Sequence, residues 1–177
     1  MHIPNSLTTK MAPSFALFVV LICSGVELVL TSCPRGWVEY QDECLLFVTN
    51  TTMGWHEAEN VCRNYPSYLV TDDNEDKHDF IEMFINVFSH NWHLRHFWNG
   101  VSDFVVENQW RWVETGVSVE STTFWDKGQP NGLDGQNCVA LTMNSANSLV
   151  WRDYDCTHKY HFICEMKATK DTIGVIG

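Results

Sequence analysis

The sequence is poor in basic residues, and beyond its first 30 residues it has no apolar run long enough to cross a membrane. It carries 11 Lys and Arg against 22 Asp and Glu, which gives a formal net charge of −11 at pH 7. Nucleic-acid phosphates are bound by basic surfaces, so this charge argues against nucleic acid as a partner. A transmembrane helix needs about 20 apolar residues, so we predict no membrane span in the mature chain.

Catalytic motifs are missing as well. No Gly-rich phosphate loop, no nucleophile beside a base and no set of metal ligands stands out by its spacing. We therefore predict a binding protein and not an enzyme. Collagen-like and heptad repeats are also missing, so the sequence does not predict an oligomeric state.

The N-terminal segment, residues 1–30, is typical of a secretory signal peptide. Residues 16–22 form a short apolar run, and the small residues Ser24 and Gly25 follow it. A membrane anchor is the alternative, but Glu27 interrupts the apolar stretch before it reaches the about 20 residues that a spanning helix needs. We therefore expect a secreted, extracellular protein.

The seven cysteines predict a disulfide framework. Cys23 lies within the predicted leader, so an even set of six remains in the mature chain. Such a set suits the oxidising environment of secreted proteins, but spacing alone leaves the pairing open. The mature cysteines are Cys33, Cys44, Cys62, Cys138, Cys156 and Cys164.

Two segments have the period of amphipathic helices. The first follows Thr52, whose hydroxyl we expect to cap the helix, and it ends before Pro66. The second covers about residues 74–88, after a polar cluster at 71–74 that suits a helix start. Their apolar positions are Trp55, Ala58, Cys62 and Tyr65 in the first helix and Phe80, Ile81, Phe84, Ile85 and Phe88 in the second.

The other regular segments are short and β-prone. Residues 37–48 predict a hairpin, which is followed by the turn-forming sequence Asn50-Thr51-Thr52. That sequence is also an N-glycosylation sequon on Asn50, in what we expect to be a loop. Five further strands are predicted at residues 97–101, 109–113, 138–143, 149–153 and 161–165, separated by Gly, Asn, Asp and Ser.

These elements predict an α+β domain at residues 32–167, with two helices followed by small antiparallel sheets. Residues 168–177 have no regular pattern and predict a frayed C-terminal tail. Residues 114–137 form a long, polar, Gly-rich loop between strands. Long loops on a stapled scaffold usually carry function, so we place the binding region there.

An ordered set of short motifs resembles the C-type lectin-like domain family over about 130 residues, which is most of the mature chain. No single motif is enough to indicate the resemblance, but the order of the motifs along the chain is specific to this family. The motifs are Cys33-Pro34-x-Gly36-Trp37, Trp55-x-Glu57-Ala58-x-x-x-Cys62, Phe97-Trp98-Asn99-Gly100-Val101, Gln129-Pro130-Asn131, Asn137-Cys138-Val139, Trp151-Arg152-Asp153-x-x-Cys156 and Phe162-Ile163-Cys164-Glu165.

The resemblance implies a fold and a disulfide pairing. It implies the long form of the fold, with a long binding loop and three disulfides, and a cis peptide before Pro130. The implied pairs are Cys33 with Cys44, Cys62 with Cys164, and Cys138 with Cys156.

The resemblance also implies a calcium and sugar site, at Gln129, Asn131, Gln136, Arg152 and Asp153. Only Asp153 among the five carries a carboxylate, and Arg152 has donors only, so Asn131 and Asp153 are the main metal ligands that remain. Ca²⁺ affinity rises with ligand charge, so we expect a weak or empty calcium site, in which Arg152 pairs with Asp153.

Nearby acids leave a calcium site open as an alternative. Asp126, Asp134 and Asp155 are close in sequence and offer further oxygen ligands by a different loop path.

Two functions follow from the resemblance. The first is an extracellular carbohydrate-recognition module that binds glycans through the long loop, in innate recognition. The second is a metal-independent lectin-like module with a degenerate calcium site, which binds a protein or another surface through the same loop. Arg152 and Gln136 favour the second.

Overall fold

The computed structural model describes residues 28–88, 95–119, 123–132 and 135–173. Its elements are β1 (Leu28–Ser32), β2 (Val38–Tyr40), β3 (Glu43–Met53), α1 (Trp55–Arg63), β4 (Tyr68–Leu69), α2 (Glu75–Phe88), β5 (His96–Ser102), β6 (Arg111–Trp112), β7 (Cys138–Met143), β8 (Leu149–Tyr154), β9 (Tyr160–Lys167) and β10 (Thr169–Ile173). The α+β class with two helices is therefore confirmed. Within the described residues, no helix is both long and apolar enough to span a membrane.

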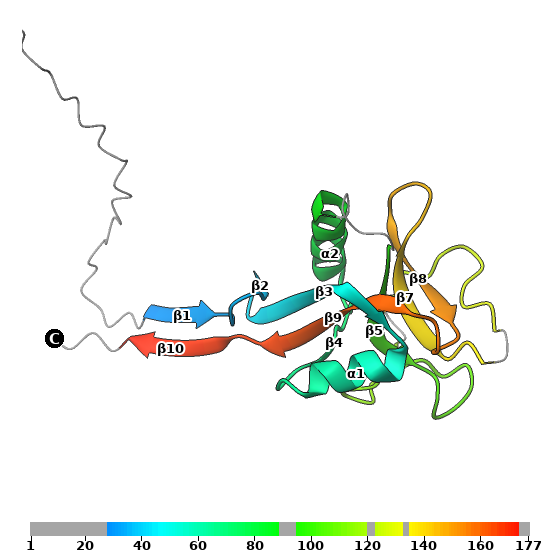
Figure 1. Cartoon of the computed structure of the whole chain (residues 1–177), viewed down its shortest axis with the longest axis horizontal. Helices are drawn as coiled ribbons and strands as arrows, with labels where there is room; N and C mark the ends of the chain where they lie inside the picture. The colour runs from blue at the N-terminus through cyan, green and yellow to red at the C-terminus, as the bar shows by residue number, and fades with distance from the viewer. Residues whose placement is uncertain (1–27, 89–94, 120–122, 133–134, 174–177) are drawn as a thin grey trace, which may run out of the picture.

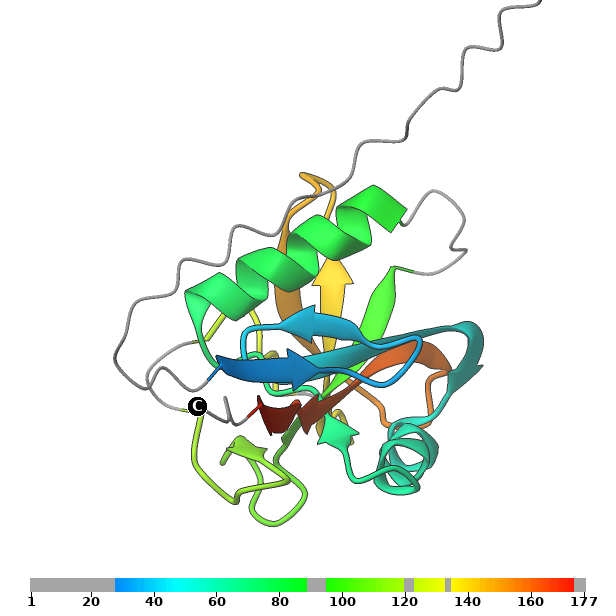
Figure 2. The same cartoon turned by 90° about the vertical axis from the view of Figure 1, so that its left-hand side faces the viewer.

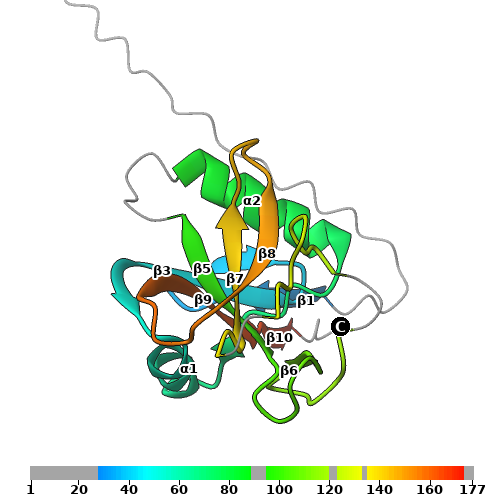
Figure 3. The same ribbon diagram turned by 90° about the vertical axis from the view of Figure 1, so that its right-hand side faces the viewer.

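One sheet forms the centre of the domain. Its strand order is β2-β3-β9-β5-β7-β8, with β4 paired to β9 and β6 paired to β5. The pairs are antiparallel except β5 with β9, which run parallel. The helices lie on opposite sides of the β3–β9 pair (Figure 1), and α2 crosses the strands obliquely (Figure 2). The β7–β8 hairpin forms the end of the sheet opposite to β2 and lies beside α2 (Figure 3).

Helix α1 begins later than the sequence predicted. Its N-cap is Gly54 and not Thr52, because β3 continues through Thr52 to pair Met53 with Tyr160. The Gly54 N–H donates to the Glu57 carboxylate at 3.1 Å. A Cβ at Gly54 would lie 3.0 Å from the Cys156 carbonyl oxygen, so the close approach of two backbones favours glycine here.

Helix α2 agrees with the predicted helix to within one residue. The Asn74 side chain accepts the Lys77 N–H at 2.9 Å and caps the helix, as the polar cluster before it predicted. Ile81 and Ile85 are buried in the core, whereas Phe88 at the end of the predicted stripe is 51% exposed. The helix also buries two polar side chains, those of Lys77 and His78.

Three disulfides hold the domain, with the pairing that the resemblance implied. They join Cys33 to Cys44, Cys62 to Cys164, and Cys138 to Cys156. The second spans 102 residues of sequence and fixes α1 to β9. Closing a loop of about 100 residues is worth on the order of 4–5 kcal/mol in the chain-entropy model.

Two terminal strands lie outside the predicted domain limits. Leu28–Ser32 overlaps the predicted leader, and Thr169–Ile173 lies in the segment predicted as a frayed tail. The two segments pair antiparallel as a separate two-stranded sheet, which projects from the domain (Figure 1). The pairing joins segments at least 137 residues apart in sequence, so a local sequence pattern could not predict it. The leader and its cleavage site stay predictions.

The sequon on Asn50 lies in β3 and not in a loop. Asn50 itself is exposed, near a register shift between Val48 and Met53 where β3 pairs irregularly with β9. The strand therefore leaves this side chain open to solvent, although it was predicted to belong to a turn.

Candidate functional site

The predicted long-loop site forms where residues 124–131 pack against β8. The Trp151 N–H donates to the Phe124 carbonyl at 2.7 Å, and the Asp126 N–H donates to the Trp151 carbonyl at 2.9 Å. The rings of Phe124 and Trp125 each meet the Trp151 indole edge-on, with 5.7 Å between centroids. Trp151 is fully buried, so its burial together with these aromatic contacts fixes the path of the loop.

Asp153 and Asn131 come together, as the resemblance implied. The Asn131 N–H donates to both carboxylate oxygens of Asp153, at 3.1 and 3.3 Å. Asp153 is 1% exposed. The Gln129–Pro130 peptide bond before Asn131 is cis, as expected.

Arg152 pairs with Asp126 and not with Asp153, so the predicted pairing is wrong. Its Nε donates to Asp126 Oδ2 at 2.8 Å, and its Nη2 donates to the same oxygen. The reason is strand geometry, because successive side chains of β8 point to opposite faces of the sheet. Asp153 points inward and is buried, whereas Arg152 points outward and is partly exposed. The hydrogen bonds from Arg152 lower the pKa of Asp126.

The buried side-chain oxygens without a hydrogen-bond partner in the described part of the chain include three in or near the long loop, Gln129 Oε1, Gln136 Oε1 and Asp103 Oδ1. Two of them belong to predicted site residues. The third was missed by sequence reasoning, although an acid directly after the buried strand β5 was a usable signal. Burial raises the pKa of Asp103, and the neighbouring charge of Asp153 raises it further.

Two of the three nearby acids have other partners. Asp126 is engaged by Arg152, and the Asp155 carboxylate accepts hydrogen bonds from Thr157 within its own turn. Asp134 lies outside the described residues.

The residues present do not fit a calcium centre of the implied charge. Ca²⁺ takes six to eight oxygens, several of them from carboxylates. Asp153 is the only carboxylate of the predicted five, and Asp103 adds one more, while Arg152 has donors only and is held by Asp126. Across the described part of the chain, no group of three or more His, Cys, Asp or Glu side chains could hold a metal ion.

Comparison with known proteins identifies the family. A family model described as the Lectin C-type domain matches residues 51–166. The chain belongs to this family. It is 32% identical over 139 residues to mouse C-type lectin domain family 4 member E, and the match covers 78% of this chain and 62% of that protein. It is also 30% identical over 150 residues to a perlucin-like protein of Mytilus galloprovincialis, with 84% and 92% covered.

Among solved structures, this chain is similar to the C-type lectin domain of murine dendritic cell inhibitory receptor 2, which was solved in complex with N-glycan. The TM-score is 0.68 at 27% sequence identity, and the match covers 77% of this chain and 99% of that domain. The shared C-type lectin domain therefore accounts for the sheet, the two helices and the three disulfides.

Proposed function

We propose that this C-type lectin domain recognises glycans through the long-loop site, without a requirement for calcium. The observation that carries the proposal is the set of buried acceptor oxygens of Gln129 and Gln136 in the long loop and of Asp103, which lies near Asp153. Buried acceptors need donors, and sugar hydroxyls supply them. The N-glycan bound by the murine receptor domain supports glycans as the ligand class.

The charge pattern supports direct contact between the protein and the sugar. Arg152 satisfies Asp126, so the two charges cancel at the edge of the site. The carboxylate of Asp153 is already oriented by the Asn131 N–H and can accept from a sugar hydroxyl. A site built to hydrogen-bond hydroxyls discriminates strongly against ligands that lack them.

The Asn131→Ala variant is expected to lower binding to an N-glycan array by at least about tenfold, because it removes one direct hydrogen-bonding group while keeping the backbone N–H that holds Asp153. Glycan binding by the oxidised, secreted chain is measured in Ca²⁺ and in EDTA. Asn60→Ala, at an exposed position of α1, is the matched control. Full glycan binding by Asn131→Ala would contradict the proposal. So would the loss of glycan binding by the natural chain in EDTA.

Calcium is tested separately by restoring ligand charge. We expect millimolar Ca²⁺ to leave the melting temperature of the natural chain unchanged. The double variant Gln136→Glu with Arg152→Asn should melt at a higher temperature in Ca²⁺ than in EDTA, since bound metal stabilises the folded state. An upward shift for the natural chain would show that the site already loads the metal.

A metal-independent interaction module is the second candidate function. The Arg152–Asp126 ion pair favours it, since that pair occupies the loop edge without a metal. A chain that binds no glycan on the array but captures a protein or mineral surface through the same loop would support it. We further propose secretion through a leader within residues 1–30, glycosylation of Asn50 and a role in innate recognition.

A further inference from the structure

The sequence contains two Asn-Gly dipeptides, Asn99-Gly100 and Asn131-Gly132. In such a pair the backbone nitrogen of the glycine can attack the side-chain carbonyl carbon of the asparagine and close a succinimide ring. The attack is intramolecular, and glycine has no Cβ to hinder it. Each dipeptide therefore carries the chemistry for deamidation, and the fold decides which of them reacts.

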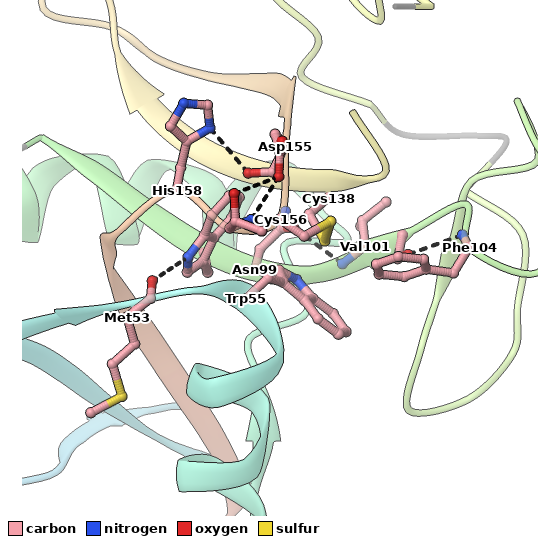
Figure 4. Close-up of a disulfide and its surroundings, with 12 residues drawn as sticks. Met53, Trp55, Asn99, Val101, Phe104, Cys138, Asp155, Cys156 and His158 are labelled. Atoms are coloured by element: carbon pink, nitrogen blue, oxygen red, sulfur yellow. Dashed lines mark hydrogen bonds between the residues drawn. A yellow bond between two sulfur atoms is a disulfide. The ribbon is translucent and has the colours of Figure 1, made fainter. Parts of the chain in front are cut away.

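The fold holds Asn99 and Gly100 rigidly within β5. Asn99 is fully buried, and its side-chain oxygen accepts the Val101 N–H at 3.1 Å. The attacking nitrogen is also committed, because the Gly100 N–H donates to the Val70 carbonyl at 3.0 Å. A Cβ at Gly100 would lie only 2.7 Å from the Leu69 carbonyl oxygen, so this backbone has no room to close a ring. Figure 4 shows Asn99 and Val101 close to the disulfide that starts from β7.

Asn131 and Gly132 have the opposite surroundings. Both are exposed and lie in the long loop, outside the helices and strands. Among the described residues, no group accepts a hydrogen bond from the Gly132 N–H. Within the same part of the chain, the atom nearest to a Cβ at Gly132 would be the Asn108 side-chain oxygen, at 3.9 Å. The backbone nitrogen is therefore uncommitted, the space around it is open, and water reaches the amide.

We infer that Asn131 is a deamidation site and that its conversion removes glycan binding from the long loop. The Gly132 nitrogen gives its proton to a base in the solvent and bonds to Cγ of Asn131. The bond from Cγ to Nδ2 breaks, and the amide nitrogen leaves as ammonia. Water then opens the succinimide at either of its carbonyls, which leaves aspartate or isoaspartate at this position. The whole conversion consumes a water molecule and releases ammonia, so it needs no enzyme and no redox partner.

The conversion changes the chemistry at the centre of the site. The amide of Asn131 both donates and accepts hydrogen bonds, whereas a carboxylate only accepts. The new charge lies near the buried carboxylate of Asp153, which the Asn131 N–H reaches at 3.1 Å, so the two like charges repel each other. In the isoaspartate product the main chain also gains a carbon atom, which displaces the loop beyond it. The loss of glycan binding rests on the proposed function, but the deamidation step does not.

The test incubates the secreted, oxidised full chain at body temperature in mildly alkaline and in mildly acidic buffer. Mass spectrometry of its peptides follows the conversion of Asn131 and of Asn99 over time. We expect conversion at least about tenfold faster at Asn131 than at Asn99 in the folded chain. Conversion should also be faster in alkaline buffer, because the glycine nitrogen must lose its proton.

The unfolded chain is the control for the role of the fold. After reduction in urea, Asn99 and Asn131 should convert at similar rates, because glycine follows both and no structure protects either. Equal rates at the two sites in the folded chain would overturn the inference. So would an Asn131 that converts in urea but stays unchanged in the folded chain.

Matched variants test the loss of binding separately. Asn131→Gln keeps an amide but would have to close a larger ring, so its binding to the N-glycan array should not decline on incubation, whatever its starting level. Asn131→Asp carries the charge of one product and should bind at least about tenfold more weakly than the fresh natural chain. A fully converted chain that binds as well as the fresh chain would overturn the loss of binding. A fresh chain that binds no glycan would contradict the proposed function, and the peptide masses would still decide the modification.

Discussion

Replacement of Lys77 by Met is expected to lower the free energy of unfolding by about 3–5 kcal/mol, because it leaves the buried carboxylate of Glu165 without its cation, while Glu43 keeps its ion pair with Lys167. Lys77 Nζ lies 2.6 Å from Glu43 and 3.2 Å from Glu165. The side chains of Lys77 and Glu165 are only 3% and 1% exposed, and that of Glu43 is 13% exposed. Solvent therefore cannot take over the role of the ammonium group.

The pKa directions agree with a charged amine in this cluster. Burial alone would lower the pKa of Lys77, but Glu165 and Glu43 outweigh it and the pKa is raised. Burial raises the pKa of Glu165, and the charge of Lys77 opposes that rise. Glu165 also accepts hydrogen bonds from the Tyr68 hydroxyl and the Thr71 N–H, so it joins α2 and β4 to β9.

Urea unfolding with the disulfides intact measures this effect. Lys127→Met, which changes an exposed lysine in the long loop, is the control and should alter stability by less than about 0.5 kcal/mol. Adding Glu165→Gln to Lys77→Met should recover part of the loss, because the amide oxygen can still accept from the Thr71 N–H while the amide NH2 donates to the Tyr68 hydroxyl. A loss below about 1 kcal/mol in the single variant would mean that water reaches the cluster.

The sequence predicted the apolar faces of the fold better than its buried polar groups. The apolar spacing of α2 identified Ile81 and Ile85 as core residues, because helical periodicity reports the face that lies against a sheet. Lys77 and His78 are on the same helix and are also buried. Their partners come from β3, β8, β9 and the segment before α2, and no pattern within the helix itself predicts those partners.

Pairing between segments distant in sequence accounts for the other differences between the predictions and the structure. The start of α1 moved from Thr52 to Gly54 because Met53 pairs with Tyr160, more than 100 residues away in sequence. In the site, the family motif placed Asn131 beside Asp153 correctly. It could not place Arg152, whose partner Asp126 depends on how aromatic residues of the loop pack on Trp151.

His78 is the second buried cation, and it joins α2 to the long loop. Its Nδ1 lies 2.7 Å from the Asp72 carboxylate and its Nε2 lies 3.0 Å from the Leu149 carbonyl. Both partners are acceptors, so a charged imidazolium satisfies both. Its ring stacks on Phe124 with 3.7 Å between centroids and 13° between planes, and Trp151 Nε1 donates to the same Asp72 oxygen at 2.6 Å.

The pKa of His78 gives this network a defined pH dependence. Burial would lower the pKa, but the hydrogen bond and charge of Asp72, the Leu149 carbonyl and the charge of Glu82 raise it above the ordinary value of 6.5. A raised folded-state pKa adds stability that is fully present below about 6.5 and is lost as the pH rises through the folded value. His96 has a lowered pKa and acts with the opposite sign, since its contribution is lost as the pH falls.

His78→Gln is therefore expected to lower the free energy of unfolding by about 3 kcal/mol below pH 6.5, and by less at higher pH. Asp72→Asn should remove the same pH dependence with little change of shape, because the amide can still accept from Trp151 but has no charge to hold the imidazolium. Urea unfolding at several pH values from 5.5 to 9 gives the slope, and imidazole NMR gives the pKa of His78 directly. His56→Gln, at an exposed position of α1, is the matched control. If the natural chain and Asp72→Asn showed the same slope of the free energy of unfolding against pH, the charged network would be wrong. If instead the slope vanishes and Trp151 becomes more accessible in the variants, His78 is the group that holds the long loop against the domain.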